Sequence, residues 1–253
     1  MSSHRRHVQR QKNQATYTFA AMEKMKNLAV MITIIALVTV GACYAAGPSA
    51  RQILENAARV YDAVQDYVVD AKLRVESPNI HVPEASIRIF FKRPRKLHVE
   101  SDRGFAILPR QGVVLDNPVR EILKEATLSL AGTDQVEGVR CYVIRVSHKQ
   151  FDRRVESTLW VDARRWLVLR MSANPEVGPS SEVSLWYTRV AGKYWLPSRT
   201  HTKLITPPLP GLDTNKNPTD AKPAVTVIDM RFSKYKVNTG ISDKIFEGEN
   251  GKK

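Results

Sequence analysis

The side chains that could perform catalysis or bind a metal are scattered through this sequence of 253 residues. The histidines after residue 46 are His81, His98, His148 and His201, and no two of them lie within four positions of each other. Paired metal ligands on one helical turn are therefore unavailable, and no phosphate-binding loop, dinucleotide fingerprint or nucleophile elbow occurs. We expect no enzymatic activity, no catalytic residue, no cofactor and no metal site, and we interpret each histidine as a solvated strand residue.

Four tryptophans are the other distinctive side chains, and each lies on or near a predicted strand. Aromatic side chains on strands commonly pack within the sheet. They can also line a concave apolar surface that receives a ligand. The sequence leaves both interpretations open for Trp160, Trp166, Trp186 and Trp195.

The apolar segment Leu28–Ala42 contains no charged residue. Lys24 and Lys26 precede it and small residues follow it, which is the pattern of a secretory signal peptide. A membrane anchor is the alternative, although the segment is short for a span of about 20 residues. We therefore interpret residues 1–45 as an N-terminal extension with a signal peptide, and we expect the mature protein in the periplasm.

Two cleavage sites compete at the end of this segment. Cleavage after Ala45 gives a soluble product in which Cys141 is the sole cysteine, so that no internal disulfide can form. Val40–Cys43 also resembles a lipobox, and cleavage there would leave Cys43 as an acylated, membrane-anchoring N-terminus. The translation start stays open among Met1, Met22 and Met25.

The chain is basic, with a formal net charge of +14, and 43% of its residues are hydrophobic. This composition suits a folded domain and excludes a disordered chain or a polytopic membrane protein. A basic surface favours anionic lipid headgroups or an acidic protein partner. We do not expect nucleic acid as a partner, because the chain is predicted to be exported and its basic residues are spread along strands.

A helix is predicted directly after the signal segment. Ser49 is a preferred N-cap residue, and Gln52 completes a capping box. Apolar residues then recur at helical spacing and form one stripe that must be buried. This stripe consists of Ile53, Ala57, Val60, Tyr61, Val64, Tyr67 and Val68.

Alternating apolar and polar residues predict a succession of half-buried strands. The first are Val69–Val75 and Ile87–Phe91, followed beyond a turn by Leu97–Val99. Turns are indicated by Gly104, Gly112, Gly138 and Gly192, and a short helix by Asn117-Pro118. Later strands are predicted at Val139–Val146, Ser157–Asp162, Leu167–Met171, Val183–Val190, Arg199–Ile205 and Val225–Phe232.

Two segments depart from this alternation. Val139–Val146 is apolar on both faces, which predicts a strand at the centre of the sheet. Residues 206–224 contain five prolines and cannot form a strand. A loop of this length is either flexible or functional, as a lid or docking element. Residues 46–253 are therefore predicted to form a single α+β domain that is mainly β.

Several short motifs, in this order, resemble those of the LolA/LolB-like family of outer-membrane lipoprotein-sorting proteins. A leading helix runs straight into a strand, and Phe91–Pro94 matches the family's KRP turn. Val136–Gly138 leads into a long strand, and Leu159–Asp162 is followed by Leu167–Met171. The later motifs are Gly192–Pro197 and Val237–Asp243 with Phe246, so that the resemblance covers residues 50–247.

The resemblance implies an incomplete antiparallel β-barrel, or half-barrel, whose open concave side is covered by helices. Acyl chains would lie between the sheet and the helices. It also implies that Arg93 of the KRP turn holds the covering helix closed through hydrogen bonds near Tyr61. Strand alternation predicts that one apolar face lines the cavity, made of Leu73, Val75, Ile87, Ile89, Phe91, Leu97 and Val99.

The expected function is that of a non-enzymatic periplasmic carrier, which moves acylated lipoproteins or related lipids toward the outer membrane. Its partners would be lipoprotein or lipid acyl chains, an inner-membrane exporter and an outer-membrane acceptor. The alternative is an envelope-stress sensor of the RseB/MucB type, which detects lipidated ligands with a similar half-barrel. Such regulators normally carry a second C-terminal domain, which favours the carrier.

Overall fold

The computed structural model describes residues 47–78, 80–102, 118–150, 153–208 and 223–247. By internal contacts the chain divides into two units, Met1–Gly47 and Pro48–Lys253, and the second is described here. The predictions for the signal peptide, Cys43, Gly104, Gly112 and Asn117 lie outside the described residues, as do residues 209–222 of the proline-rich segment. Within the described ranges, no helix is both long and apolar enough to cross a membrane.

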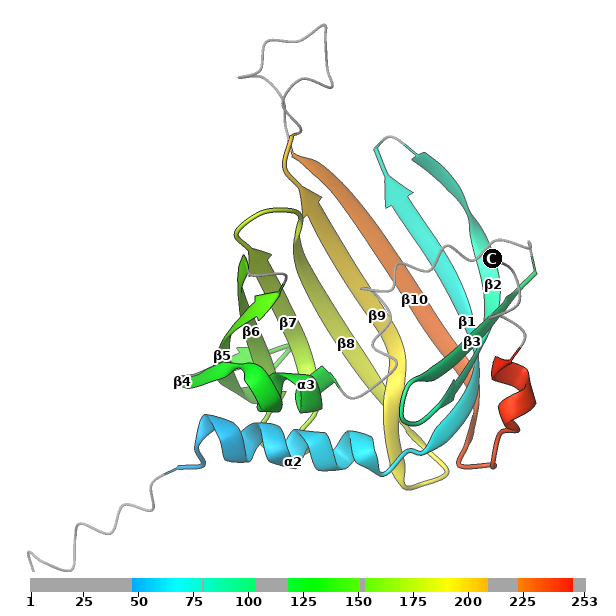
Figure 1. The fold of residues 1–253 in the computed structure, drawn as a ribbon, viewed down its shortest axis with the longest axis horizontal. Coiled ribbons are helices and arrows are strands. Elements are labelled where there is room, and N and C mark those ends of the chain that lie inside the picture. Colours follow the sequence, from blue (N-terminus) through cyan, green and yellow to red (C-terminus); the bar gives the residue numbers. More distant parts are fainter. Residues whose placement is uncertain (1–46, 79, 103–117, 151–152, 209–222, 248–253) are drawn as a thin grey trace, which may run out of the picture. The chain divides into compact units, whose positions relative to one another are not determined.

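Ten antiparallel strands form one open sheet in the order β3-β2-β1-β10-β9-β8-β7-β6-β5-β4 (Figure 1). Strands that are neighbours in the sheet are also consecutive in the sequence, with one exception. This exception is the pair formed by β1 and β10. The elements are α2 (Ala50–Asp62), β1 (Asp66–Ser77), β2 (Ile80–Lys92), β3 (Lys96–Ser101), α3 (Pro118–Glu125), β4 (Thr127–Val136), β5 (Val139–Gln150), β6 (Arg153–Asp162), β7 (Val168–Pro175), β8 (Ser180–Val190), β9 (Tyr194–Thr206), β10 (Ala224–Val237) and a 3-10 turn η2 (Asp243–Phe246).

The predicted capping box begins helix α2. The backbone N–H of Gln52 donates to the Ser49 hydroxyl, and the Ser49 N–H donates to Oε1 of Gln52 at 2.9 Å. These bonds satisfy two N–H groups that a helix start otherwise leaves unpaired. The apolar stripe of α2 then packs on β5, β6 and β7 together with α3. The buried residues at this contact are called the helix cluster, and they include Ile53, Leu54, Ala57, Ala58, Val119, Ile144, Val146, Leu159, Val161 and Val168.

Helix α2 is shorter than the stripe predicted. It ends at Asp62, and the strand β1 begins at Asp66, so that Tyr67 and Val68 belong to β1. Tyr67 lies opposite Phe91 on β2 and Val237 on β10. Pairing with two strands satisfies the backbone of this segment, and β-branched and aromatic side chains suit a strand better than a helix. The prediction of helix up to Tyr67 is therefore wrong at its end.

Strand β5 lies next to the edge strand β4, so the prediction that Val139–Val146 is central is wrong. Its two faces are nevertheless both buried. Ile144 and Val146 belong to the helix cluster on one face, and Cys141 packs with Leu167 and Leu169 on the other. Burial on both faces therefore follows from local packing here, and does not require a central position.

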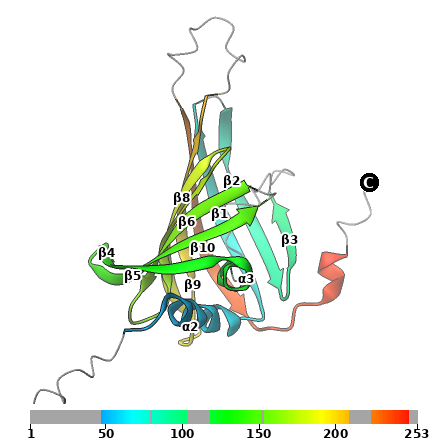
Figure 2. The same ribbon diagram turned by 60° about the vertical axis from the view of Figure 1, so that its left-hand side comes forward.

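Strand β4 was not recognised in the sequence because nearly all of its side chains are exposed. A strand exposed on both faces carries no apolar alternation. The other predicted strands and the hairpin turns at Gly138 and Gly192, both with positive φ, are confirmed. The sheet bends around α2, which lies across one end of the strands in both views (Figures 1 and 2).

Candidate functional site

The inner face of the sheet, defined as the face on which α2 packs, carries most of the predicted cavity residues. Val69 lies opposite Ile89, and Ile89 lies opposite Val99 on the next strand, so these side chains share one face. The buried members of this inner-face cluster are Val64, Tyr67, Val69, Ala71, Leu73, Ala85, Ile87, Ile89, Phe91, Leu196, Ile228 and Met230.

The seven residues predicted to line the cavity differ in how deeply they are buried. Leu73, Ile87, Ile89 and Phe91 are buried, whereas Val75 and Val99 are half-buried and pack against the cluster. Leu97 lies on the edge strand β3 opposite Phe91 and is 37% exposed. The apolar face therefore continues to the sheet edge, where it meets solvent.

The buried members of the inner-face cluster come from strands and from the link between α2 and β1. The helix cluster, by contrast, covers β5 to β7. Figures 1 and 2 agree that α2 lies across one end of the sheet, while β1, β2 and β10 extend away from it. The helix cluster and the inner-face cluster thus lie over different strands of the same face of the described sheet.

Two threonines interrupt the apolar rows at the middle of this face. One row runs from Met171 through Val183, Thr202 and Ile228 to Val75, each opposite the next. The next row has Leu185, Thr200, Met230 and Leu73 opposite one another in the same way. Neither threonine stands out in the sequence, because threonine is common in strands and its hydroxyl gives no periodic signal.

Arg93 joins the KRP turn to the end of α2. Its Nε donates to the carbonyl oxygen of Val64 at 2.7 Å, and its Nη2 donates to that of Tyr61 at 2.8 Å. Its Nη1 also lies 3.3 Å from Oδ1 of Asp62. The last carbonyls of a helix lack intrahelical donors, and the forked guanidinium supplies them. The bond that the resemblance implied between Arg93 and Tyr61 is present, with an arginine side chain that is 20% exposed.

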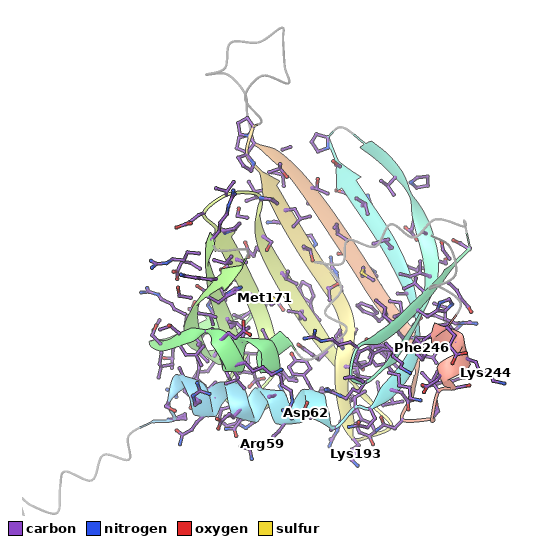
Figure 3. The ribbon with its side chains drawn as sticks, viewed as in Figure 1. Arg59, Asp62, Met171, Lys193, Lys244 and Phe246 are labelled. Carbon is purple, nitrogen blue, oxygen red and sulfur yellow. The ribbon has the colours of Figure 1, made fainter. Side chains whose placement is uncertain are left out.

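The carboxylate of Asp62 also binds a side chain of α3. Nε of Arg120 donates to both carboxylate oxygens of Asp62 at 2.9 Å. Asp62 is the last residue of α2 (Figure 3). One carboxylate therefore ties α2 both to α3 and to the turn between β2 and β3.

The side chain of Tyr61 is held separately from its backbone. Its hydroxyl lies 2.8 Å from the hydroxyl of Tyr187 on β8, and the Tyr187 hydroxyl donates to the carbonyl oxygen of Val168 at 2.9 Å. Because Tyr187 has a single proton to donate, Tyr61 must be the donor in the bond between them. Burial raises the pKa of Tyr61 and raises that of Tyr187 well above the ordinary value.

The link between α2 and β1 is anchored by the motif Val237–Asp243. Oδ1 of Asn238 accepts from the backbone N–H of Gln65 at 2.7 Å. Asp66 is buried and accepts from the N–H groups of Thr239 and Gly240 at 2.9 and 3.1 Å. The motif Val237–Asp243 therefore makes the contacts that anchor the chain where α2 stops.

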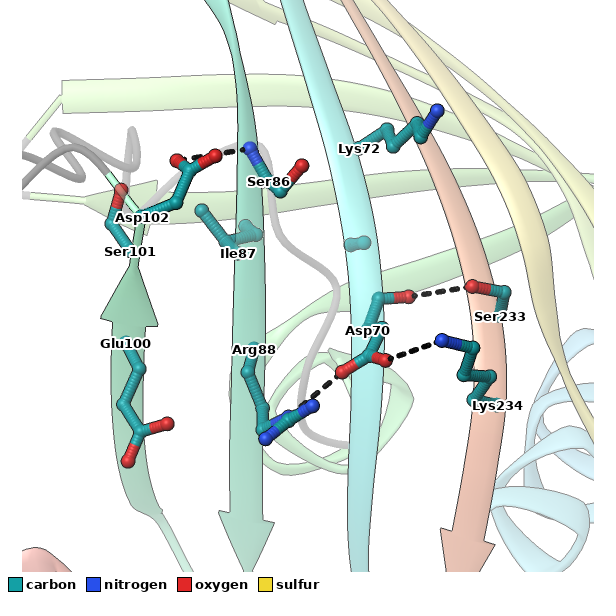
Figure 4. A pocket seen from close by; sticks show the side chains of 11 residues that line it. Asp70, Lys72, Ser86, Ile87, Arg88, Glu100, Ser101, Asp102, Ser233 and Lys234 are labelled. Atoms are coloured by element: carbon teal, nitrogen blue, oxygen red, sulfur yellow. Dashed lines mark hydrogen bonds and ion pairs between the residues drawn. The ribbon is translucent and has the colours of Figure 1, made fainter.

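Over β1, β2, β3 and β10 the outer face of the sheet carries many charged and hydroxyl side chains. An open depression of about 460 Å³ on this face is lined by charged and hydroxyl side chains of β1, β2, β3 and β10 (Figure 4). There Asp70 accepts from Arg88 at 2.8 Å and lies 3.6 Å from Lys234. These partners, first of all the Arg88 hydrogen bond, lower the pKa of Asp70. The depression does not suit an acyl chain, because charged and hydroxyl side chains line it.

Most tryptophans pack with arginine on the outer face. The guanidinium of Arg199 lies 4.9 Å from the ring of Trp186, which is opposite it, and Arg170 lies 5.6 Å from the ring of Trp160. Trp166 instead stacks on Tyr142 and packs against the helix cluster. The interpretation that tryptophans line the concave face is therefore wrong for Trp160 and Trp186, whose indole N–H groups donate to Asp134 and Glu137.

His98, His148 and His201 are strand residues, as predicted, and they are half-buried and so only partly solvated. Nδ1 of His201 lies 3.3 Å from Asp229, and Nδ1 of His148 is buried. His98 packs against Phe90, and the side chain of His81 lies outside the described residues. In the part of the chain that the structure describes, no three metal-binding side chains gather at one point.

No protein-family model and no curated protein matches the sequence. Solved structures do. A DUF1329 family protein from Desulfovibrio piger ATCC 29098 is 16% identical with a TM-score of 0.51, covering 78% of this chain and 97% of its own. A LolA superfamily protein from Nitrosomonas europaea is 13% identical with a TM-score of 0.50, covering 79% and 98%. At these identities the likeness concerns the fold, and the predicted fold class is confirmed: the chain is a mainly β, LolA-like open sheet with covering helices.

Proposed function

We propose that this protein is a non-enzymatic carrier of the bacterial cell envelope that binds the acyl chains of lipoproteins or related lipids. The observation that carries the proposal is the apolar inner face, on which a large cluster of aliphatic and aromatic side chains lies beside the strands that the helix cluster covers. Burial of an acyl chain there would yield about 0.8 kcal/mol per methylene group. A chain of sixteen carbons would therefore gain roughly 10 kcal/mol before the costs of association.

The contacts of Arg93 supply a reversible closure. They tie the end of α2 to the turn between β2 and β3, which are the strands that carry much of the inner-face cluster. Each such hydrogen bond contributes on the order of 1 kcal/mol net. A few bonds of this strength can be exchanged for the contacts of an entering acyl chain, so that cargo shifts the protein from a closed to an open state.

The proposal includes export to the periplasm, removal of the signal peptide or acylation of Cys43, and transfer of cargo from an inner-membrane exporter to an outer-membrane acceptor. The motifs of Leu28–Ala42 and Val40–Cys43 support export. The LolA-like fold supports an acylated cargo.

The test is mass spectrometry of lipids that co-purify with the full chain from its own envelope, followed by a transfer assay. We expect an acylated molecule at close to one per protein, and its delivery to acceptor vesicles. An isolated protein without acylated molecules would overturn the proposal. A sensor of the RseB/MucB type would bind such ligands but would not deliver them to vesicles, so the second measurement separates the two functions.

A further inference from the structure

The hydroxyl groups of Thr200 and Thr202 are buried and have no hydrogen-bond partner among the residues that the structure describes. The two residues are 2% and 1% exposed, and within the described ranges Oγ1 of each neither accepts nor donates a hydrogen bond. A buried hydroxyl without a partner destabilises a fold, because its hydrogen bonds to water are lost and not replaced. Valine has nearly the same shape as threonine and would fill both positions without this cost.

Both hydroxyls are placed among apolar side chains. Thr202 lies between Val183 and Ile228, and Thr200 lies between Leu185 and Met230, all of them buried. Directly opposite residues of neighbouring strands present their side chains on the same face. Since Met230 and Ile228 belong to the inner-face cluster, the two threonines also lie on the inner face.

The position of β9 in the sheet determines which part of a bound ligand would reach the two hydroxyls. This strand lies in the middle of the sheet, between the strands of the inner-face cluster and those under the helix cluster. A ligand spread over the inner face would therefore place its middle, and not its end, at β9. A hydroxyl can donate or accept a hydrogen bond. The polar groups that an acyl-glycerol ligand carries beside its apolar chains are ester oxygens, which only accept, so the hydroxyls would act as donors.

We propose that Thr200 and Thr202 bind the ester carbonyl oxygens of an acyl-glycerol ligand in the inner face. The inference rests on the proposed function and names the ligand class for the same site: ester-linked acyl chains, in preference to ether-linked chains of equal length. A carbonyl oxygen accepts a hydroxyl hydrogen bond, whereas an ether-linked chain has no carbonyl oxygen and keeps only the linkage oxygen within the chain. Carbonyl oxygens of the ligand would satisfy hydroxyls that the protein leaves unpaired.

Thr226 is a matched control on the neighbouring strand. It lies two positions from Ile228 on the same face of β10 and is half-buried, but its hydroxyl already donates to Ser77 at 3.1 Å. Its replacement by valine removes a hydroxyl of the same chemistry that has a partner within the protein. Any general effect of a lost hydroxyl on the fold therefore appears in Thr226→Val as well.

The test is a competition between two lipids. The full chain is incubated with vesicles that contain a diacyl phospholipid and its dialkyl ether analogue in equal amounts, and the lipids bound to the re-isolated protein are counted by mass spectrometry. We expect the wild type to prefer the ester lipid at least about fivefold, the ratio that one net hydrogen bond gives. The double variant Thr200→Val/Thr202→Val should bind both lipids equally, and Thr226→Val should keep the preference.

Two further measurements test whether the lost hydroxyls themselves, and not damage to the fold, change the lipid preference. Without lipid, the double valine variant should unfold at a higher urea concentration than the wild type, whereas Thr226→Val should unfold at a lower one. Thr202→Ser in the background of Thr200→Val should restore part of the ester preference, because it returns a hydroxyl.

The outcomes separate the inference from the function on which it rests. If the wild type binds both lipids without preference, or if the preference survives in the double valine variant, the threonine site is overturned and the carrier function stands. If the wild type takes up neither lipid, both are overturned.

Discussion

The hydroxyls of Tyr61 and Tyr187 meet at 2.8 Å, and they connect the last turn of α2 with strand β8. The carbonyl oxygen of Tyr61 also accepts a hydrogen bond from Arg93, which lies in the turn between β2 and β3. The end of α2 is thus attached at one residue to two strands that lie far apart in the sheet order. A helix attached in this way can be released by changing either contact, which makes the two contacts separately testable.

Tyr187→Phe should destabilise the protein more than Tyr61→Phe. The first change leaves the Val168 carbonyl without its donor and the Tyr61 hydroxyl without its acceptor, which costs about 1–3 kcal/mol. The second leaves the bond from Tyr187 to Val168 in place and should cost about 1 kcal/mol. Urea denaturation of both variants gives the comparison, and equal losses would contradict the assigned direction of the hydrogen bonds.

Arg93→Leu should loosen the end of α2 while the sheet stays folded. The carbonyls of Tyr61 and Val64 would lose donors, with an expected cost of about 2 kcal/mol. If Arg93 acts as a latch, uptake and release of a fluorescent fatty-acid probe should both become faster. Stopped-flow measurements with Arg95→Leu on the same turn provide the control, and wild-type rates in Arg93→Leu would show that no latch operates.

Ile89→Asp should abolish uptake of the same probe. Ile89 is fully buried at the centre of the inner-face cluster, and a carboxylate there would repel an acyl chain. Because this change can also unfold the protein, Ile89→Ala is measured beside it and should weaken binding with a smaller loss of stability. Lys72→Asp places a carboxylate on the outer face of β1 and should leave uptake unchanged. Probe binding that is equal in folded Ile89→Ala and in the wild type would remove this face from the site.

The stability of the protein should fall in acid because of Asp162. Burial raises the pKa of this carboxyl, but hydrogen bonds from the N–H groups of Arg164 and Arg165 and from the Arg165 guanidinium outweigh burial, so that the pKa is lowered overall. A lowered pKa means that the unfolded chain binds the proton first. The stabilisation is therefore complete above the ordinary aspartate pKa of about 3.9 and is lost as the pH falls through the lower value of the folded state.

The measurement is the free energy of unfolding in urea between neutral pH and about pH 2. Asp162→Asn should be less stable than the wild type at neutral pH and should lose less stability on acidification. The same acid dependence in both proteins would assign the loss to other carboxyls, among them Asp229, which Arg199 and His201 contact.

At alkaline pH the buried tyrosines should make the stability of the protein fall as the pH rises. Burial raises the pKa values of Tyr187 and Tyr235 well above 10, so the folded state keeps protons that the unfolded chain releases. Their contribution to stability is complete below about pH 10 and declines as the pH rises further. Tyr187→Phe should remove a part of this decline, which ultraviolet absorbance of tyrosinate and urea denaturation can follow together.

The sequence by itself determined the local elements whose signals are periodic. The capping box at Ser49 and Gln52 positions the start of α2, and strand alternation put Leu73, Ile87, Ile89 and Phe91 on one face before their partners were known. These features depend on neighbouring residues or on a period of two, so a linear pattern is sufficient to reveal them. The contact of Arg93 with the end of α2 was instead implied by the family resemblance that includes Phe91–Pro94.

The tertiary structure decided what depends on partners distant in the chain. The end of α2 is set by Asn238 and by the pairing of β1 with β10, which join residues more than 150 positions apart. The place of β5 beside an edge, the arginine partners of the tryptophans and the isolation of the Thr200 and Thr202 hydroxyls are likewise set by which strand lies next to which. Alternation gives each side chain one of two faces, but only the assembled sheet determines which face is covered and whether a buried hydroxyl finds a partner there.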